Sequence, residues 1–230
     1  MEVLEEKKIE TQEIVATKIE GISEPRGLYK ALKRAFDFAF SLIGLILLSP
    51  AFLIIAIIIK FDSKGSVFYV QKRIGLNGKL FKIYKFRTMV VGADKKLRKY
   101  LKENPEASEE YGKYKKLNDD PRTTKIGNFL RKTSLDELPQ LINILKGEMS
   151  IVGPRPYLLK EKKDMGQYYE PIVTCKPGLT CIWQVSGRSN LSFEQRLQLD
   201  MEYLNKRSIK LDLLLILKTF TKILKSEGAV

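Results

Sequence analysis

Two adjacent carboxylates, Asp136 and Glu137, lie within residues 128–157, the stretch richest in residues able to do chemistry. Asp136 is a candidate nucleophile, because an ionised carboxylate can attack phosphorus. Ser134 and Glu137 also fit a helix-capping box, and this interpretation is favoured when the motif is taken alone, because caps are common. Pro139 favours instead a helix that begins nearer Asp136, whose positive end would keep that carboxylate ionised.

Basic side chains accompany this pair of carboxylates. Arg131 lies five residues before Asp136, and Arg155 lies in the stiff Gly-Pro-Arg-Pro turn near the end of the stretch. Lys85 and Arg87 close a predicted β-hairpin. Each basic group alone is more often a solvated surface charge. Together they suit a diphosphate, because arginine binds phosphate oxygens bidentately. The residues expected to bind substrate phosphate are Lys85, Arg87, Arg131 and Arg155.

A third segment, KPGLTCIWQVSGRSN at 176–190, contains the single tryptophan, Trp183. Residue types alone favour packing of this side chain in the core. The functional alternative makes it one wall of a nucleotide or sugar pocket. The residues assigned to that pocket are Pro154, Pro156, Trp183, Gln184, Gly187 and Arg188.

The composition limits the chemistry further. The chain has no histidine, which excludes Ser–His and Cys–His catalysis and zinc bound by histidine. Cys175 and Cys181 are too few and wrongly spaced for a zinc site, and they suggest a reducing compartment. A formal net charge of +14 favours anionic partners, which are nucleic acid, phosphorylated metabolites or an anionic lipid leaflet, and charge alone does not choose among them. No helix-turn-helix or RNA-binding signature is found, so no nucleic-acid partner is expected.

One apolar segment indicates attachment to a membrane. Phe38–Ile59 contains 22 residues without a formal charge. As a straight helix it reaches roughly 33 Å, enough to span a bilayer. Pro50 favours a kink, and Ser49 beside it can help to satisfy a bent backbone. Basic residues flank both ends and prefer the cytoplasmic side. Residue types alone therefore support spanning and re-entrant arrangements equally.

The rest of the chain predicts an α+β fold that is mainly helical. Residues 67–71 and 79–86 have strand character, and Asn77-Gly78 between them is a strong turn signal, so a small β-hairpin is expected. The charged segment 93–120 predicts a solvated helix and loop. Helical patterning returns at about 134–147 and 192–206, and residues 211–225 predict an amphipathic helix, either packed in the core or lying at the membrane interface.

These motifs occur in an order that resembles a known family. The matching elements are KRAFD, the mid-membrane Ser49-Pro50, QKRIG, YKFRTM, DPR with TKIG, LRKTSLDELPQLINILKGEMSIVGPRP, KPGLT and WQVSGRSNLSFEQRLQLDMEYL. From about residue 32 to its end, the chain resembles the bacterial sugar transferase family, the monotopic phosphoglycosyl transferases. The order of these motifs and the length of chain that they cover together make the resemblance specific, which no single motif would do.

The resemblance implies a reaction. Such enzymes transfer a sugar 1-phosphate from a UDP-sugar to undecaprenyl phosphate and release UMP, the first step of exopolysaccharide, O-antigen or glycoprotein glycan synthesis. Asp136 matches the family's nucleophile, which forms a covalent phosphosugar intermediate, and Glu137 matches the neighbouring acid. Magnesium is implied, with Asp136 near the metal. Arg131 and Arg155 resemble phosphate ligands.

The resemblance also implies a membrane arrangement. The Ser49-Pro50 break makes the membrane helix re-entrant, with both ends at the cytoplasmic face of the bacterial inner membrane. The expected organisation is an N-terminal arm at 1–27, a re-entrant helix–break–helix at 28–60, and a catalytic domain with interfacial helices at 61–230. The implied partners are the UDP-sugar, undecaprenyl phosphate and the lipid bilayer, and a homodimer is one candidate assembly.

Two points distinguish this chain within the resemblance. Cys181 stands where many relatives have glycine, beside the expected donor pocket. The motif WQVSGRS favours galactose or glucose over acetamido sugars. Two other functions are compatible with the basic residues alone: a glycosyltransferase that releases UDP, and a non-catalytic membrane-anchored module that binds nucleic acid or anionic lipid.

Overall fold

The computed structural model describes residues 27–114, 117, 119–187 and 191–224, so the expected N-terminal arm lies almost entirely outside the described residues. The described chain is mostly helical, with one antiparallel β-hairpin and one short parallel strand pair. This confirms the predicted fold class, whereas its placement in a membrane stays a prediction.

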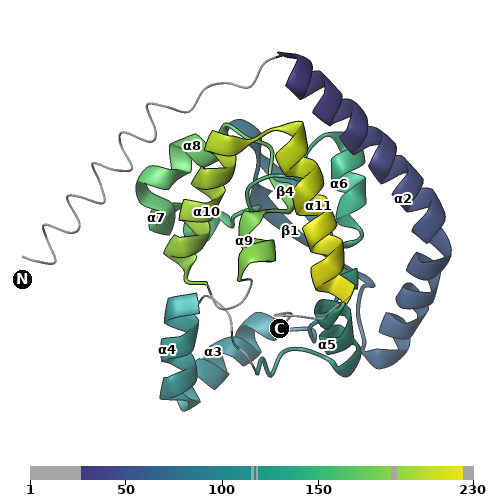
Figure 1. Cartoon of the computed structure of the whole chain (residues 1–230). Coiled ribbons are helices and arrows are strands. Elements are labelled where there is room, and N and C mark those ends of the chain that lie inside the picture. Colours follow the sequence, from purple (N-terminus) through teal and green to yellow (C-terminus); the bar gives the residue numbers. More distant parts are fainter. Residues whose placement is uncertain (1–26, 115–116, 118, 188–190, 225–230) are drawn as a thin grey trace, which may run out of the picture.

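The first described helix, α2, runs from Gly27 to Asp62 and forms an arc along one side of the molecule (Figure 1). It is long and apolar enough to cross a membrane, and only 11% of its most apolar window is buried. The backbone stays helical through Pro50, so α2 does not end there, and the re-entrant arrangement bent at Ser49-Pro50 stays a prediction. Proline leaves the carbonyl of Ile46 without its amide donor. The Ser49 hydroxyl donates to that carbonyl at 2.8 Å, which helps the helix to continue.

Both ends of α2 are fixed to the same domain. Near its start, the Arg34 guanidinium donates to the carbonyls of Ile144 and Leu145 at 2.7 and 2.9 Å. Near its end, Ile55 and Ile59 pack in one apolar cluster with residues of the hairpin and of a later helix. The helix therefore lies across the domain, while many of its outward apolar side chains remain exposed.

The predicted hairpin is confirmed. Strand β1 (Phe68–Ile74) pairs antiparallel with β2 (Leu80–Phe86), from Phe68↔Phe86 to Ile74↔Leu80. A 3₁₀ turn, η1 (Leu76–Gly78), joins them. Asn77 and Gly78 have φ values of 54° and 73°, the left-handed conformation that Asn and Gly adopt most readily.

Short helices follow the hairpin and build the rest of the domain. The charged segment after residue 92 forms two helices, as expected of a solvated region. The last two helices confirm the predicted helical segments at 192–206 and 211–225. These elements are α3 (Ala93–Glu103), α4 (Pro105–Tyr114), α5 (Lys125–Lys132), η2 (Leu135–Glu137), α6 (Gln140–Lys146), η3 (Leu159–Glu161), α7 (Lys162–Met165), η4 (Gly166–Tyr168), α8 (Tyr169–Val173), α9 (Ile182–Ser186), α10 (Phe193–Lys206) and α11 (Ile209–Leu224).

A second, unexpected strand pair joins two of the sequence motifs. Strand β3 (Ser150–Val152) pairs in parallel with β4 (Gly178–Thr180). Directly after β3, the backbone of Gly153 lies so close to residues 176–178 that any Cβ would overlap it. Glycine at both Gly153 and Gly178 therefore lets the Gly-Pro-Arg-Pro turn lie beside the segment that leads to the tryptophan.

Candidate active site

The two carboxylates lie on a single turn whose local structure differs from both sequence-based expectations. Asp136 and Glu137 belong to η2, and α6 begins only at Gln140, after Pro139. The side chain of Ser134 makes no capping bond, because this residue adopts a left-handed conformation with φ of 59°. The capping box and the helix start near Asp136 are therefore both wrong. Proline has no amide hydrogen, so it fits the N-cap position that it occupies.

Burial dominates the electrostatics of Asp136, whose exposed fraction is 8%. Desolvation raises the pKa of Asp136 to about 6, and the neighbouring charge of Glu137 adds to this, whereas Lys85 and Arg131 oppose it. The direction is opposite to the one expected from a helix terminus. At pH 7 a carboxyl group with such a pKa is still about 90% ionised. Asp136 is thus a poorly solvated carboxylate of raised basicity, as an attacking oxygen requires.

Glu137 is held by an ion pair. Lys85 of β2 donates from its ammonium group to Glu137 Oε1 at 2.5 Å. Burial tends to raise the pKa of Glu137, but the charges of Lys85 and Arg155 outweigh it, so the pKa is lowered overall. Glu137 therefore remains ionised, and it fixes the lysine beside Asp136.

A small cavity of about 60 Å³ adjoins this ion pair, and we call it the cationic pocket. The residues that line it and matter below are Arg73, Lys85, Glu137, Arg155, Trp183 and Gln184. It contains three cationic side chains and one acidic one, so it suits an anion. Its volume is far below the ~300 Å³ of ordinary ligand sites, so a nucleotide sugar would extend beyond it.

Trp183 belongs to this pocket, although residue types alone favoured core packing. The Arg155 guanidinium carbon lies 5.4 Å from the centroid of the Trp183 ring, a cation–π distance. The indole Nε1 is buried, and no acceptor among the described residues lies within hydrogen-bond distance of it. A buried donor without a partner at the edge of a pocket is available to a ligand.

Arg73 is a pocket residue that the sequence reasoning did not assign. Its guanidinium donates to the carbonyl of Pro156 at 3.0 Å and to Gln71 Oε1 at 2.7 Å. Burial, together with the nearby charge of Arg155, lowers the pKa of Arg73 to about 10, so the side chain stays cationic at neutral pH. Its only signal in the sequence is its position inside the QKRIG motif.

Arg131 and Arg87, both expected to bind phosphate, have different environments. Arg131 lies in α5, where it donates to the hydroxyls of Thr88 at 3.0 Å and Thr123 at 3.3 Å, and its charge acts on Asp136. Arg87 donates instead to the carbonyls of Ser63 and Lys64 at 2.6 and 2.8 Å. These bonds satisfy backbone acceptors at the end of α2, so the structure does not bring Arg87 to the cationic pocket.

The remaining residues assigned to the pocket differ in their positions. Pro156 and Gln184 line the cationic pocket. Pro154 has a structural role, because its carbonyl accepts a hydrogen bond from the Gly178 amide at 2.8 Å. Gly187 follows α9 and contacts Leu191 rather than the cavity. Arg188 lies outside the described residues.

A buried acid, Asp200 of α10, supports the turn that carries Arg155. Its Oδ2 accepts the Tyr157 hydroxyl at 2.7 Å and the Arg155 amide at 3.2 Å. Its other oxygen is buried, with no partner among the described residues. Burial raises the pKa of Asp200 to about 7, although its hydrogen bonds oppose this. Sequence reasoning missed this residue, because an isolated Asp on a helix carries no distinctive pattern.

An exposed apolar helix indicates membrane association, and adjacent carboxylates beside a cationic pocket indicate chemistry on phosphate-bearing molecules. Fold and site thus define a membrane-associated enzyme. The chain matches the model of the family described as bacterial sugar transferase over residues 28–226, and it belongs to that family. It is therefore a transferase.

Individual relatives support this assignment. The chain is 46% identical over 197 residues to the exopolysaccharide production protein ExoY of Sinorhizobium fredii, covering 86% of this chain and 87% of that protein. It is 41% identical over 198 residues to the undecaprenyl-phosphate galactose phosphotransferase of Salmonella typhimurium. It is 37% identical over 211 residues to the UDP-glucose:undecaprenyl-phosphate glucose-1-phosphate transferase of Escherichia coli. These two matches cover 86% and 88% of this chain but only 41% and 42% of the longer relatives.

Proposed function

We propose that this protein transfers a sugar 1-phosphate from a UDP-sugar to undecaprenyl phosphate, releases UMP, and so begins the synthesis of an exopolysaccharide or a related glycan. The observation that carries the proposal is the buried Asp136 beside the Lys85–Glu137 ion pair and the cationic pocket. The names of the relatives favour galactose or glucose as the sugar.

In the first step, a carboxylate oxygen of Asp136 attacks the phosphorus that bears the sugar. A new phosphorus–oxygen bond forms to Asp136, and the bond between this phosphorus and the bridging oxygen of UMP breaks. In the second step, a phosphate oxygen of undecaprenyl phosphate attacks the same phosphorus, and the carboxylate of Asp136 leaves. A covalent intermediate lets the donor and acceptor phosphates react in turn, so their charges need not meet in one site.

The cationic side chains assist both steps by holding phosphate oxygens. Arg73 and Arg155 supply guanidinium groups to one pocket, and Lys85 brings an ammonium group next to the carboxylates. Arg131 adds a further positive charge that acts on Asp136. Phosphoryl transfer depends mainly on positioning and on neutralising oxygen charge, which these groups do. The Trp183 indole suits a role in orienting the nucleotide or the sugar.

Magnesium is compatible with this site. The described residues contain no group of three or more metal-binding side chains. Magnesium commonly needs only one or two carboxylates together with substrate phosphates, and the desolvated Asp136 carboxylate would gain from a nearby cation. When bound, magnesium would neutralise charge on the phosphate oxygens. Asp136 is the side chain expected to hold it.

We also propose a monotopic placement of α2 at the cytoplasmic face of the inner membrane. Near the start of α2, Arg34 donates to the carbonyl of Ile144, and just after its end Arg87 donates to the carbonyl of Lys64. Both ends of the helix are therefore bonded to the same domain. A helix crossing the bilayer would separate these ends by the thickness of the membrane. The arrangement predicts that introduced cysteines at residues 28 and 64 are both modified by an impermeant reagent from the cytoplasmic side only.

The reaction is tested with the purified full chain, undecaprenyl phosphate, magnesium and separate UDP-sugars, and the released nucleotide is identified. UMP is expected, whereas UDP would overturn the proposal. Asp136→Asn is expected to abolish turnover, and Asp94→Asn, an exposed acid of α3, serves as the matched control. Without acceptor, the wild-type chain should release about one UMP per active site and gain the mass of a sugar phosphate. Near-normal turnover of Asp136→Asn would exclude Asp136 as the nucleophile.

A further inference from the structure

A second and larger cavity, of about 380 Å³, lies between α2 and α11 above strand β3. We call it the α2–α11 groove. Its rim consists of exposed apolar side chains, and its floor is buried. The rim residues are Leu32, Phe36, Ile209 and Leu213, and the apolar floor residues are Ile151, Val152 and Ile216.

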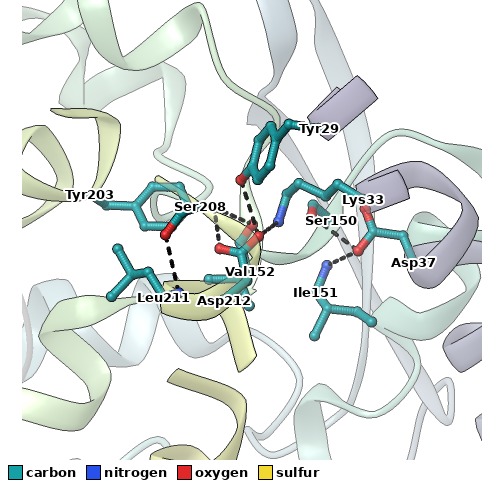
Figure 2. A network of polar contacts seen from close by, with 10 residues as sticks. All are labelled: Tyr29, Lys33, Asp37, Ser150, Ile151, Val152, Tyr203, Ser208, Leu211 and Asp212. Atoms are coloured by element: carbon teal, nitrogen blue, oxygen red, sulfur yellow. Dashed lines mark hydrogen bonds and ion pairs between the residues drawn. The ribbon is translucent and has the colours of Figure 1, made fainter. Parts of the chain in front are cut away.

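The charged groups in this groove are hydrogen-bonded within the protein. Lys33 donates to Asp212 Oδ2 at 2.7 Å, and the Tyr203 hydroxyl donates to Asp212 Oδ1 at 2.8 Å. Asp37 Oδ1 accepts the amide of Ile151 at 2.9 Å (Figure 2). Figure 2 shows Lys33 and Asp37 side by side on α2, each directed toward its partner on the opposite element. The groove therefore offers a ligand mainly hydrocarbon contacts.

The chemistry of the groove favours an uncharged chain. Its charged lining residues are Lys33, Asp37 and Asp212, one cation against two carboxylates, so the groove repels an anionic headgroup. An apolar cavity of this kind holds water poorly but binds apolar groups. By volume it accommodates roughly a dozen water-sized groups, enough for a substantial part of an acyl chain.

The groove opens on the exposed apolar surface of α2, the surface that the proposed placement turns toward lipid. The exposed apolar residues of its rim continue into those of α2, the helix with membrane-like hydropathy. On α11, the exposed Leu214, Leu217 and Phe220 extend the same apolar character. A chain leaving the bilayer would therefore enter the groove without crossing water.

The acceptor's phosphate, as proposed above, would lie far from this groove. Asp37 at the groove and Ile59 are 22 residues apart, or about 33 Å along the helix. Ile59 packs in the cluster that contacts Leu135, the residue before Asp136. An acceptor whose phosphate lies at Asp136 would thus have its headgroup near the opposite end of α2 from the groove.

We infer that the α2–α11 groove binds one acyl chain of a bilayer phospholipid. The chain fills the space between α2 and α11 and becomes part of the packing that joins these two helices. The inference rests on membrane association and does not depend on the proposed reaction.

The test uses the full chain in nanodiscs of phosphatidylethanolamine and phosphatidylglycerol that contain a trace of phospholipid with a photoreactive diazirine in its acyl chain. After irradiation, peptide mass spectrometry locates the adducts. Labelling is expected to concentrate at residues 32–36 and 209–216. Excess unlabelled phospholipid should reduce this labelling, whereas excess undecaprenyl phosphate should not.

Variants distinguish the groove from general contact with lipid. Leu213→Trp narrows the rim and should lower groove labelling on the order of tenfold, because excluding about two methylene groups costs that much affinity. Leu217→Trp, one turn later on α11 and outside the groove, should leave labelling of the groove unchanged. Labelling at the exposed Leu53 is the internal reference, and Leu213→Phe replaces the Trp variant if melting shows that it is misfolded.

Two outcomes would overturn the inference. If labelling in the groove only equals labelling at Leu53 and is not reduced by Leu213→Trp or Leu213→Phe, the groove merely touches the bilayer. If undecaprenyl phosphate displaces the labelled phospholipid, the occupant is the acceptor's chain. Loss of UMP release in a separate assay would bear on the proposed reaction alone, so the two proposals fail independently.

Discussion

Replacing Asp200 by Asn removes one buried titratable carboxyl group and retains the hydrogen bonds that this residue accepts. The amide oxygen of Asn can still accept the Tyr157 hydroxyl and the Arg155 amide. Burial raises the pKa of Asp200 from 3.8 to about 7 in the folded protein. The folded state therefore holds this proton more tightly than the unfolded chain does.

The sign and size of the effect follow from this difference. Below the unfolded pKa both states are protonated, and the contribution to stability is fully present. As pH rises toward 7, the unfolded chain releases its proton first, so stability falls. A shift from 3.8 to about 7 corresponds to an upper value of about 4 kcal/mol, at 1.36 kcal/mol per pH unit. In a chain of this size that equals a melting-temperature change of roughly 8–16 °C.

The assay compares melting temperatures of the wild-type chain and Asp200→Asn in the same nanodiscs between pH 4 and pH 8. Other groups, including Asp136, titrate in both proteins, so their effects largely cancel in the difference. The wild-type chain should lose stability relative to the variant as pH rises. Asp94→Asn, at an exposed position, should show no such trend. A difference between wild type and Asp200→Asn that stays constant across the range would refute a raised pKa at Asp200.

Three further pairs of substitutions test the packing of the fold and the site. Gly127→Ala should destabilise the protein by about 1–3 kcal/mol, because the added Cβ would overlap a neighbouring backbone carbonyl. Gly112→Ala, in an open helical position, should instead stabilise the protein by about 0.5–1 kcal/mol. Melting temperatures in nanodiscs measure both effects. Ser49→Ala should cost about 1 kcal/mol in the same measurement, and Ser49→Thr should recover part of it. Lys85→Met should greatly reduce UMP release, whereas Lys82→Met, at an exposed position three residues earlier on β2, should retain it. Equal rates of UMP release in the two variants would show that Lys85 has no role in the reaction.

Local signals predicted the elements that depend on local chemistry. The Asn77-Gly78 pair specifies a turn that few other residues adopt easily, so the hairpin followed from the sequence. The start of α10 also has a local cause, because Ser192 and Gln195 form reciprocal capping bonds. Pairing of β3 with β4 could not be predicted in this way, since each strand has three residues and meets its partner only through the tertiary fold.

The candidate site was only partly predictable for the same reason. Asp136 and Lys85 were found because a family pattern marks their segments, but the raised pKa of Asp136 depends on burial that only the folded chain creates. Arg87 shows the converse. Its position two residues after Lys85 suggested a phosphate ligand. Arg87 lies just beyond the end of β2, and its guanidinium bonds the carbonyls of Ser63 and Lys64 directly after α2, a long-range contact that the sequence does not reveal.

The end of α2 and the catalytic turn belong to one apolar cluster, and this links membrane placement to chemistry. Ile55 and Ile59 of α2 pack with Phe86 and Leu130, and Leu135 contacts the same cluster one residue before Asp136. Arg87, next to Phe86, donates to the carbonyls of Ser63 and Lys64 directly after α2 and so joins this end to the hairpin that carries Lys85. In the proposed arrangement, the depth of α2 in a bilayer therefore fixes the height of the carboxylates above it. An enzyme that must reach a lipid phosphate gains from this rigid connection, because positioning accounts for much of the acceleration of phosphoryl transfer.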